Sequence, residues 1–284
     1  MCARALFWFR QDLRVHDNPG LKFACDAGSL IPLYIQEDTP ETLYAMGSAS
    51  KWWLHHALKD LNLQLNNQLR LESGDPLTII RSYIKKYNID VLAWNRCYEP
   101  WRISRDKKIK EKLSKLCDVK SFNASLLWEP WEILKKDSTP YRVFTPYYKR
   151  GCLSAPNPRL PCEKPQSTVF IEKKKPQGQL KKLHLLPEKI WGQHLKHPSP
   201  HASNDLLEHA TDFIINKIEH YKKARDYPSL KKTSYLSAAI HFGQVSVNEL
   251  WYETLRNGNS EGHEHFLSEL GWREFSYYLL YHFP

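Results

Sequence analysis

Short apolar runs alternate with longer amphipathic segments over residues 5–124. β-Strands are predicted at the runs ALFWF, LIPLYI, DVLAW and VKSFNA, with a weaker strand at LRLESG. Strands that alternate with helices pair in parallel through right-handed crossovers, so the predicted fold class is α/β, a doubly wound five-stranded sheet. Such sheets bind ligands at the carboxyl ends of their strands.

Helices are predicted between these strands. Segment 48–66 places its apolar residues on one stripe, with Ser48 or Ser50 as the capping residue. Asp75 and Pro76 predict the start of a second helix, because Asp caps well and Pro suits the first helical position. The lysine-rich segment 102–117 is the third.

The amino-acid composition changes after the α/β part. Prolines and lysines cluster in residues 129–203, which predicts an interdomain connection. Residues 204–284 regain helical spacing in the patterns 203–225, 234–257 and 263–283. The second domain is therefore expected to be helical.

Composition and charge narrow the class of protein. Hydrophobic residues make up 42% of 284, which supports a buried core, and no apolar run reaches the roughly 18 residues of a membrane span. The 6 cysteines form no C-x-x-C pair, which argues against a zinc knot, and we expect a cytoplasmic protein. The net charge of +10 favours a polyanionic partner but also suits a basic protein that binds no nucleic acid. Neither G-x-G-x-x-G nor G-x-x-x-x-G-K-[ST] occurs, which disfavours a hydride-transfer enzyme and a nucleoside triphosphatase.

One helical face near the end of the chain carries an acid, an aromatic ring and a cation. Glu269, Trp272, Arg273 and Ser276 share this face at i, i+3, i+4 and i+7. Trp272 could stack on a base while Glu269 hydrogen-bonds its edge and Arg273 holds a phosphate. The alternative is structural, with an exposed ion pair between Glu269 and Arg273 and with Trp272 in the core.

The segment KKTSYLS suggests an anion site. Thr233, Ser234 and Ser237 stand at the start of a predicted helix, after Lys231 and Lys232. Hydroxyls and the positive end of a helix dipole favour an anion such as phosphate. Alternatively, Thr233 or Ser234 only caps the helix.

The chain resembles the photolyase and cryptochrome family, because motifs of that family occur in the family's order: ALFWFRQDLRVHDNPGL, YRVFTPYYKR, YKKARDYP, TSYLSAAIHFGQVS and ELGWREF. It looks most like cyclobutane pyrimidine dimer photolyases, since Glu269 stands where six-four photolyases and animal cryptochromes have Gln. The resemblance implies an antenna domain over 1–128, a connection over 129–203, and the first part of an all-α FAD-binding domain over 204–284.

The resemblance also implies site residues. FAD-binding positions are implied at Tyr221, Thr233, Ser234, Tyr235, Leu236 and Ser237. DNA-facing positions are implied at Arg225, Glu269, Leu270, Gly271, Trp272, Arg273, Glu274, Phe275 and Ser276. Glu269 and Trp272 are the implied catalytic pair, and no metal is expected. Trp272 stacks on a dimer flipped out of damaged DNA, and Glu269 hydrogen-bonds its bases while light-excited reduced FAD donates an electron. A monomer is expected.

Two departures leave alternatives open. Trp101 and Arg102 stand where folate-binding members have Asn-Glu, so folate binding is in doubt. Asn95, Tyr98 and Glu99 lie at a strand's carboxyl end, so the identity of a second antenna chromophore stays open. The family's helical domain continues well beyond the last residue of this chain, so FAD binding by these residues alone stays open. The alternatives to a repair enzyme are a cryptochrome-like blue-light signalling flavoprotein and an inactive product that retains only the antenna domain.

Overall fold

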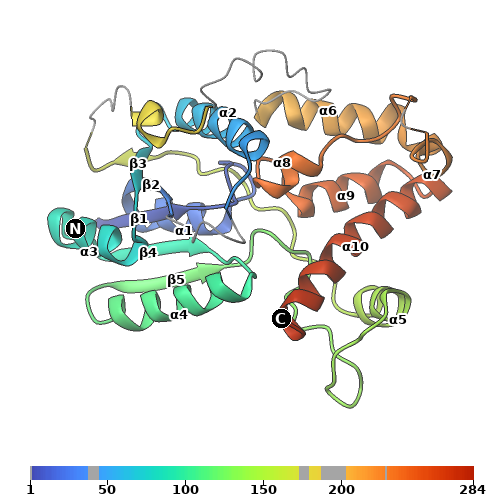
Figure 1. Cartoon of the computed structure of the whole chain (residues 1–284), viewed down its shortest axis with the longest axis horizontal. Coiled ribbons are helices and arrows are strands. Elements are labelled where there is room, and N and C mark those ends of the chain that lie inside the picture. Colours follow the sequence, from blue (N-terminus) through green and yellow to red (C-terminus); the bar gives the residue numbers. More distant parts are fainter. Residues whose placement is uncertain (1, 38–44, 173–178, 187–202, 228) are drawn as a thin grey trace.

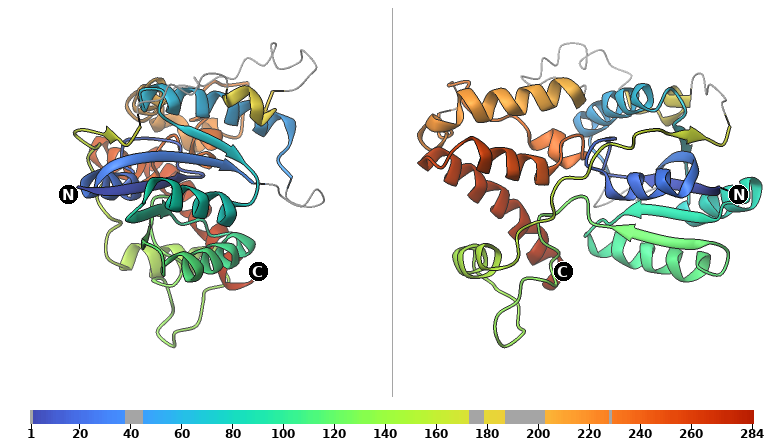
Figure 2. Two further views of the ribbon diagram at one scale, coloured as in Figure 1. Left: turned by 90° about the vertical axis from the view of Figure 1, so that its left-hand side faces the viewer. Right: turned by 180° about the vertical axis from the view of Figure 1, so that it is seen from behind.

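The computed structural model describes residues 2–37, 45–172, 179–186, 203–227 and 229–284. An α/β part and a helical part lie side by side, and α10 ends close to the segment that joins them (Figure 1). The same arrangement is seen from behind and from the side (Figure 2). Within the described ranges, no helix is long and apolar enough to cross a membrane.

The sheet has the predicted strands. They are β1 (Ala3–Phe9), β2 (Gly28–Gln36), β3 (Arg70–Ser73), β4 (Val91–Asn95) and β5 (Asp118–Phe122). Their order is β3-β2-β1-β4-β5, and every pair is parallel. The predicted α/β class is confirmed, and the strand order reverses between β1 and β4, where such sheets form ligand sites.

Helices cover both faces of the sheet because alternate residues of β1 point to opposite sides. Phe7 and Phe9 pack with α1 (Pro19–Ala27) and α2 (Ser48–Gln64), whereas Leu6 and Trp8 pack with α3 (Pro76–Tyr87) and α4 (Pro100–Leu113). α1 was not predicted from the sequence, and its first turn is capped by the Asn18 side chain.

The helix starts were predicted with mixed success. Asp75 accepts a hydrogen bond from the Thr78 amide at 2.8 Å, which confirms it as the cap of α3. The prediction that Ser48 or Ser50 caps α2 is wrong, because Gly47 occupies that position and no side chain caps the helix. The apolar stripe of α2 is buried as expected.

The helical part contains more breaks than predicted. Its helices are α6 (Ser203–Asn216), α7 (Tyr221–Ala224), α8 (Ser237–His241), α9 (Val247–Asn257) and α10 (Glu261–His282), with a 3-10 turn, η5 (Ile218–His220), before α7. The single helix expected over 234–257 is wrong. Gly243 adopts φ 69° against the backbone of Gln11 and Asp12, and Ser246 then caps α9.

The segment predicted as a connection also contains regular structure. β6 (Val169–Phe170) pairs with the start of β2, and η3 (Gln179–Leu183) is a 3-10 turn. The segments α5 (Phe144–Pro146), η1 (Tyr147–Gly151) and η2 (Cys152–Ser154) lie next to one another, and Tyr147 of η1 packs on Phe275 and Tyr278 of α10. The connection therefore supports both parts of the molecule.

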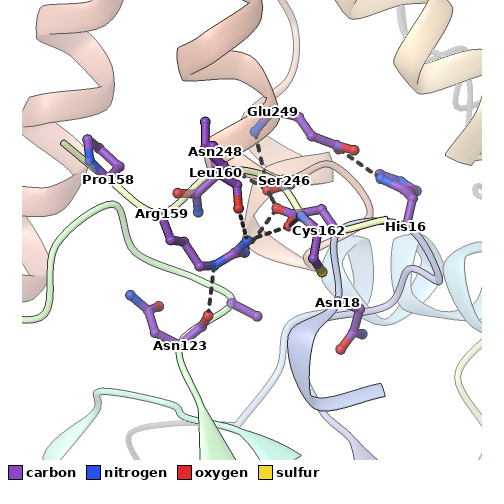
Figure 3. Close-up of polar contacts among 12 residues, drawn as sticks. His16, Asn18, Asn123, Pro158, Arg159, Leu160, Cys162, Ser246, Asn248 and Glu249 are labelled. Carbon is purple, nitrogen blue, oxygen red and sulfur yellow. Dashed lines mark hydrogen bonds and ion pairs between the residues drawn. The ribbon is translucent and has the colours of Figure 1, made fainter. Parts of the chain in front are cut away.

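The loop after β1 holds the two parts together (Figure 3). Asp17 is fully buried and accepts hydrogen bonds from Arg159 Nη2 at 3.0 Å, the Cys162 amide at 2.8 Å and the Ser246 hydroxyl. Burial alone would raise the pKa of Asp17, but the hydrogen bond and charge of Arg159 and the charge of Arg14 hold it below its usual value. One carboxylate thus joins the sheet, the connection and the cap of α9.

Candidate active site on the helical part

Trp272 lies on the surface of α10 with one face of its indole covered. The Phe144 ring stacks on it with centroids 3.8 Å apart and planes 13° from parallel. Trp272 nevertheless remains 46% exposed, so the structural alternative, in which it lies in the core, is wrong and its other face is open. An open indole face supported from behind can stack on a planar group such as a base.

Glu269 lies one turn before Trp272 and forms an ion pair with Arg225, the residue after α7. His265 Nε2 lies 3.7 Å from the same carboxylate oxygen and 3.0 Å from Arg225 Nη1. Hydrogen bonding and the charge of Glu269 raise the pKa of the half-exposed Arg225, although burial opposes this. The alternative ion pair between Glu269 and Arg273 is therefore wrong in the described structure.

Arg273 points away from this surface. Its Nη1 donates to the Ser125 carbonyl at 2.7 Å and to Glu274 Oε1 at 2.9 Å, and its guanidinium lies over the Tyr277 ring. The Glu274 side chain is only 1% exposed and accepts a hydrogen bond from the Leu127 amide at 2.8 Å. Burial raises the pKa of Glu274 to about 7. Arg273 and Glu274 thus join α10 to the segment after β5.

The predicted DNA-facing residues divide between two sides of α10. Glu269, Trp272 and Ser276 reach the surface, and the Ser276 hydroxyl donates to the Trp272 carbonyl at 2.9 Å. Buried positions are Leu270, Gly271, Glu274 and Phe275. A direct DNA contact is open to the first group, whereas the second group packs beneath it.

The residues implied to bind FAD lie at the start of α7, which begins at Tyr221, and in the segment 233–237 that leads into α8. Tyr221 is buried against Phe213 and Phe266, and Leu236 is also buried. Tyr235 has φ 52°, which is unusual for a residue with a side chain. The alternative in which Thr233 or Ser234 caps the next helix is wrong, because Leu236 precedes α8 and no side chain caps it. The predicted help from a helix dipole is also weak, since α8 has 5 residues.

The hydroxyls of this segment can still bind an anion. Ser234 Oγ lies 3.5 Å from the Leu236 amide, whereas the Thr233 and Ser237 hydroxyls have no hydrogen bond within the part of the chain that the structure describes. Ser237 is exposed and Thr233 is half-buried, so both can be reached from solvent. This donor set fits the phosphates of a dinucleotide such as FAD.

A cavity of about 390 Å³ opens at the carboxyl ends of β1 and β2. Among its lining residues are Arg10, Tyr34, Glu37, Lys51, Trp101 and Arg102. Arg10 and Arg102 both line it, and Nε and Nη2 of the buried Arg10 and Nε of Arg102 have no hydrogen-bond partner among the described residues. Trp101 and Arg102 stood out in the sequence, whereas Arg10, which stands directly after β1, did not.

Asn95, Tyr98 and Glu99, which were expected at a strand's carboxyl end, bind other side chains of the protein. Asn95 is buried and donates to Asp12 at 2.5 Å and to Asn18 at 2.7 Å, and Tyr98 donates to Glu129 at 2.8 Å. Both therefore serve the fold in this structure. Glu99 lies 3.5 Å from Arg102 at the start of α4. No group of metal-ligating side chains is found in the described ranges.

Comparisons with known proteins agree with this architecture. A family model described as DNA photolyase matches residues 5–166. The deoxyribodipyrimidine photo-lyase of Agrobacterium fabrum is 35% identical over 291 residues, which cover 99% of this chain and 60% of the relative. Cryptochrome-1 of Arabidopsis thaliana is 31% identical over 307 residues, which cover 99% of this chain and 43% of the relative.

Solved structures of photolyases are also similar to this chain. A class III photolyase from Agrobacterium tumefaciens is 34% identical with a TM-score of 0.91, over 100% of this chain and 60% of that one. An archaeal photolyase from Sulfolobus tokodaii, described with two FAD molecules, shares the fold at 23% identity with a TM-score of 0.75, over 99% of this chain and 60% of that one. This chain spans about 60% of the length of the photolyases it matches. With the family model covering more than half of its residues, the chain belongs to the DNA photolyase family.

Proposed function

We propose that this chain belongs to a light-driven, FAD-dependent lyase that splits cyclobutane pyrimidine dimers in damaged DNA. The observation that carries the proposal is the joint placement of Glu269 and the open face of Trp272 on one surface of α10, beside Arg225. Such a surface offers a stacking platform, a hydrogen-bonding carboxylate and a cation within neighbouring helical turns.

These side chains suit a dimer extruded from the duplex. Damaged bases stack poorly, so flipping them out costs less than flipping an intact base. Trp272 would stack on the extruded dimer through its open face. Glu269, oriented by Arg225 and His265, would hydrogen-bond the edges of the bases, and Arg225 would also attract the DNA backbone.

FAD would lie near Tyr221 and the segment 233–237. When bound in its reduced state and excited by light, it supplies the electron for dimer cleavage. The hydroxyls of Thr233 and Ser237, which have no hydrogen-bond partner among the described residues, would donate to its phosphates. The cavity lined by Arg10 and Trp101 would hold a second, light-harvesting chromophore, because it lies at the strands' carboxyl ends and is lined by the cationic side chains of Arg10 and Arg102.

The proposal is tested by replacing Trp272. Trp272→Ala removes a stack worth about 1–3 kcal/mol per base, so we expect binding to an oligonucleotide with one thymine dimer to weaken about 5- to 150-fold. Binding to the undamaged oligonucleotide should change much less. Trp131→Ala is the matched control, since Trp131 is 44% exposed and contacts Tyr281 instead of Phe144. Equal losses on both DNAs would contradict the proposal.

A cryptochrome-like signalling flavoprotein is the second candidate. The 31% identity to Cryptochrome-1 and the 30% identity to Cryptochrome-2 of Arabidopsis thaliana favour it. Wild-type protein that retains FAD and binds dimer-containing and undamaged DNA with equal affinity would support this candidate over repair.

A further inference from the structure

Phe144 belongs to a column of stacked rings behind the candidate active site. Its ring stacks on Trp272 and is also nearly parallel to the Tyr148 ring, with the latter centroids 5.4 Å apart and the planes 10° from parallel. The order of the column is therefore Tyr148, Phe144 and Trp272. Only the Trp272 end of this column is substantially exposed.

The column is fixed by contacts to α10. Gly271 lets the Tyr148 ring approach the helix, since a Cβ at that position would lie 2.6 Å from two of its ring carbons. Phe275 packs edge-on against both Phe144, at 5.9 Å, and Trp272, at 6.0 Å. Such contacts leave few alternative positions for the Phe144 ring.

The segment that carries Phe144 is fastened on either side. The Tyr141 amide donates to the Tyr278 hydroxyl at 2.9 Å, and Tyr147 is buried against the Tyr278 ring. Phe144 thus stands on a short turn with anchors three residues before and three residues after it. A ring held in this way can hold its neighbour in place.

We propose that Phe144 is the positioning residue for Trp272, and that it fixes the plane on which a flipped pyrimidine dimer stacks. This inference rests on the function proposed above. A half-exposed indole without support would sample several rotamers, and ordering such a side chain on binding weakens affinity by about 2- to 13-fold. Phe144 removes that cost because the indole is already in place before DNA binds.

The test combines two readouts on the full chain. The first is the ¹⁹F spectrum of protein labelled with 5-fluorotryptophan, in which the Trp272 signal is identified by its loss in Trp272→Phe. The second is the ratio of affinities for an oligonucleotide with one thymine dimer and for its undamaged counterpart. Phe144→Leu keeps an apolar side chain but removes the ring, Phe144→Tyr keeps the ring, and Val143→Ala changes an exposed neighbour.

We expect Phe144→Leu to shift the Trp272 signal and lower the affinity ratio by about 2- to 13-fold, with Phe144→Tyr and Val143→Ala close to wild type. In a Trp272→Ala background, Phe144→Leu should lower the ratio no further, because Phe144 acts through Trp272. Phe144→Met serves the same purpose if the leucine variant does not fold.

The outcomes separate this inference from the proposed function. An unmoved Trp272 signal, or a shifted signal with an unchanged affinity ratio in Phe144→Leu, would overturn the role of Phe144 while Trp272→Ala still lowers the ratio. If Trp272→Ala itself leaves the ratio unchanged, the proposed function fails first. A further loss in the double variant equal to that in wild type would show that Phe144 acts independently of Trp272.

Discussion

Glu274 should make the stability of this chain depend on pH. Its carboxyl group is buried where α10 meets the segment after β5, and burial raises its pKa from 4.5 to about 7. The folded chain therefore binds a proton more tightly than the unfolded chain between these values. The contribution of this bound proton to the free energy of unfolding is fully present below pH 4.5 and is lost as the pH rises through about 7.

The size of the effect follows from the shift. A rise of one pKa unit corresponds to about 1.4 kcal/mol, so the ionised carboxylate at pH 8 costs about 3 kcal/mol relative to pH 4.5. Glu274→Gln keeps a similar shape without the ionisation. We therefore expect the free energy of unfolding to fall between pH 4.5 and 8 by about 3 kcal/mol more in wild type than in Glu274→Gln.

Urea unfolding followed by circular dichroism at both pH values measures this difference. Comparison with the variant removes the contributions of the other titrating groups, which both proteins share. Glu264→Gln is the matched control, since Glu264 is exposed on the same helix, and it should keep the wild-type pH dependence. The same pH dependence in wild type and Glu274→Gln would refute the reasoning.

Other contacts give further expectations. Asp17→Ala leaves Arg159 without its buried partner and should lower the free energy of unfolding by about 3–5 kcal/mol, measured by urea unfolding at pH 7. A loss below about 1 kcal/mol, which is the range of an exposed ion pair, would contradict a central role of Asp17 at the interface. The wild-type contribution of Asp17 should be present above its ordinary pKa and be lost as the pH falls through the lowered value. Arg225→Ala should reduce the salt dependence of DNA binding by about one phosphate contact, and an unchanged slope in a salt titration would argue against that contact. Ser237→Asp places a negative charge at the proposed phosphate site and should weaken FAD retention without altering the melting temperature of the FAD-free chain. Undiminished FAD absorbance would exclude this role.

The sequence was most informative where one physical signal dominates. The central strands β1, β2 and β4 are strongly apolar, and Asp75 followed by Pro76 marks a helix start by local geometry alone. By contrast, α1 is short and stands between apolar strands, so its spacing is hard to separate from theirs. β6 has 2 residues and forms only because β2 lies beside it.

The candidate site, too, could be predicted only where local sequence decides the structure. Helical spacing correctly brings Glu269 and Trp272 to one surface, but it cannot tell that Arg273 turns towards the Ser125 carbonyl. That choice depends on the α/β part, which is distant in sequence. Phe144 was missed for the same reason, since its contact with Trp272 is tertiary and only the motif YRVFTPYYKR marked its position.

Light-dependent dimer cleavage tests the central proposal most directly. The chain is incubated with reduced FAD and an oligonucleotide that contains one thymine dimer, binding of both is verified, and the remaining dimer is counted after blue light or darkness. We expect the dimer to disappear only in the light, and cleavage to fall sharply in Glu269→Ala. A preparation that binds both FAD and the damaged DNA, yet leaves the dimer intact under blue light, would contradict the proposal.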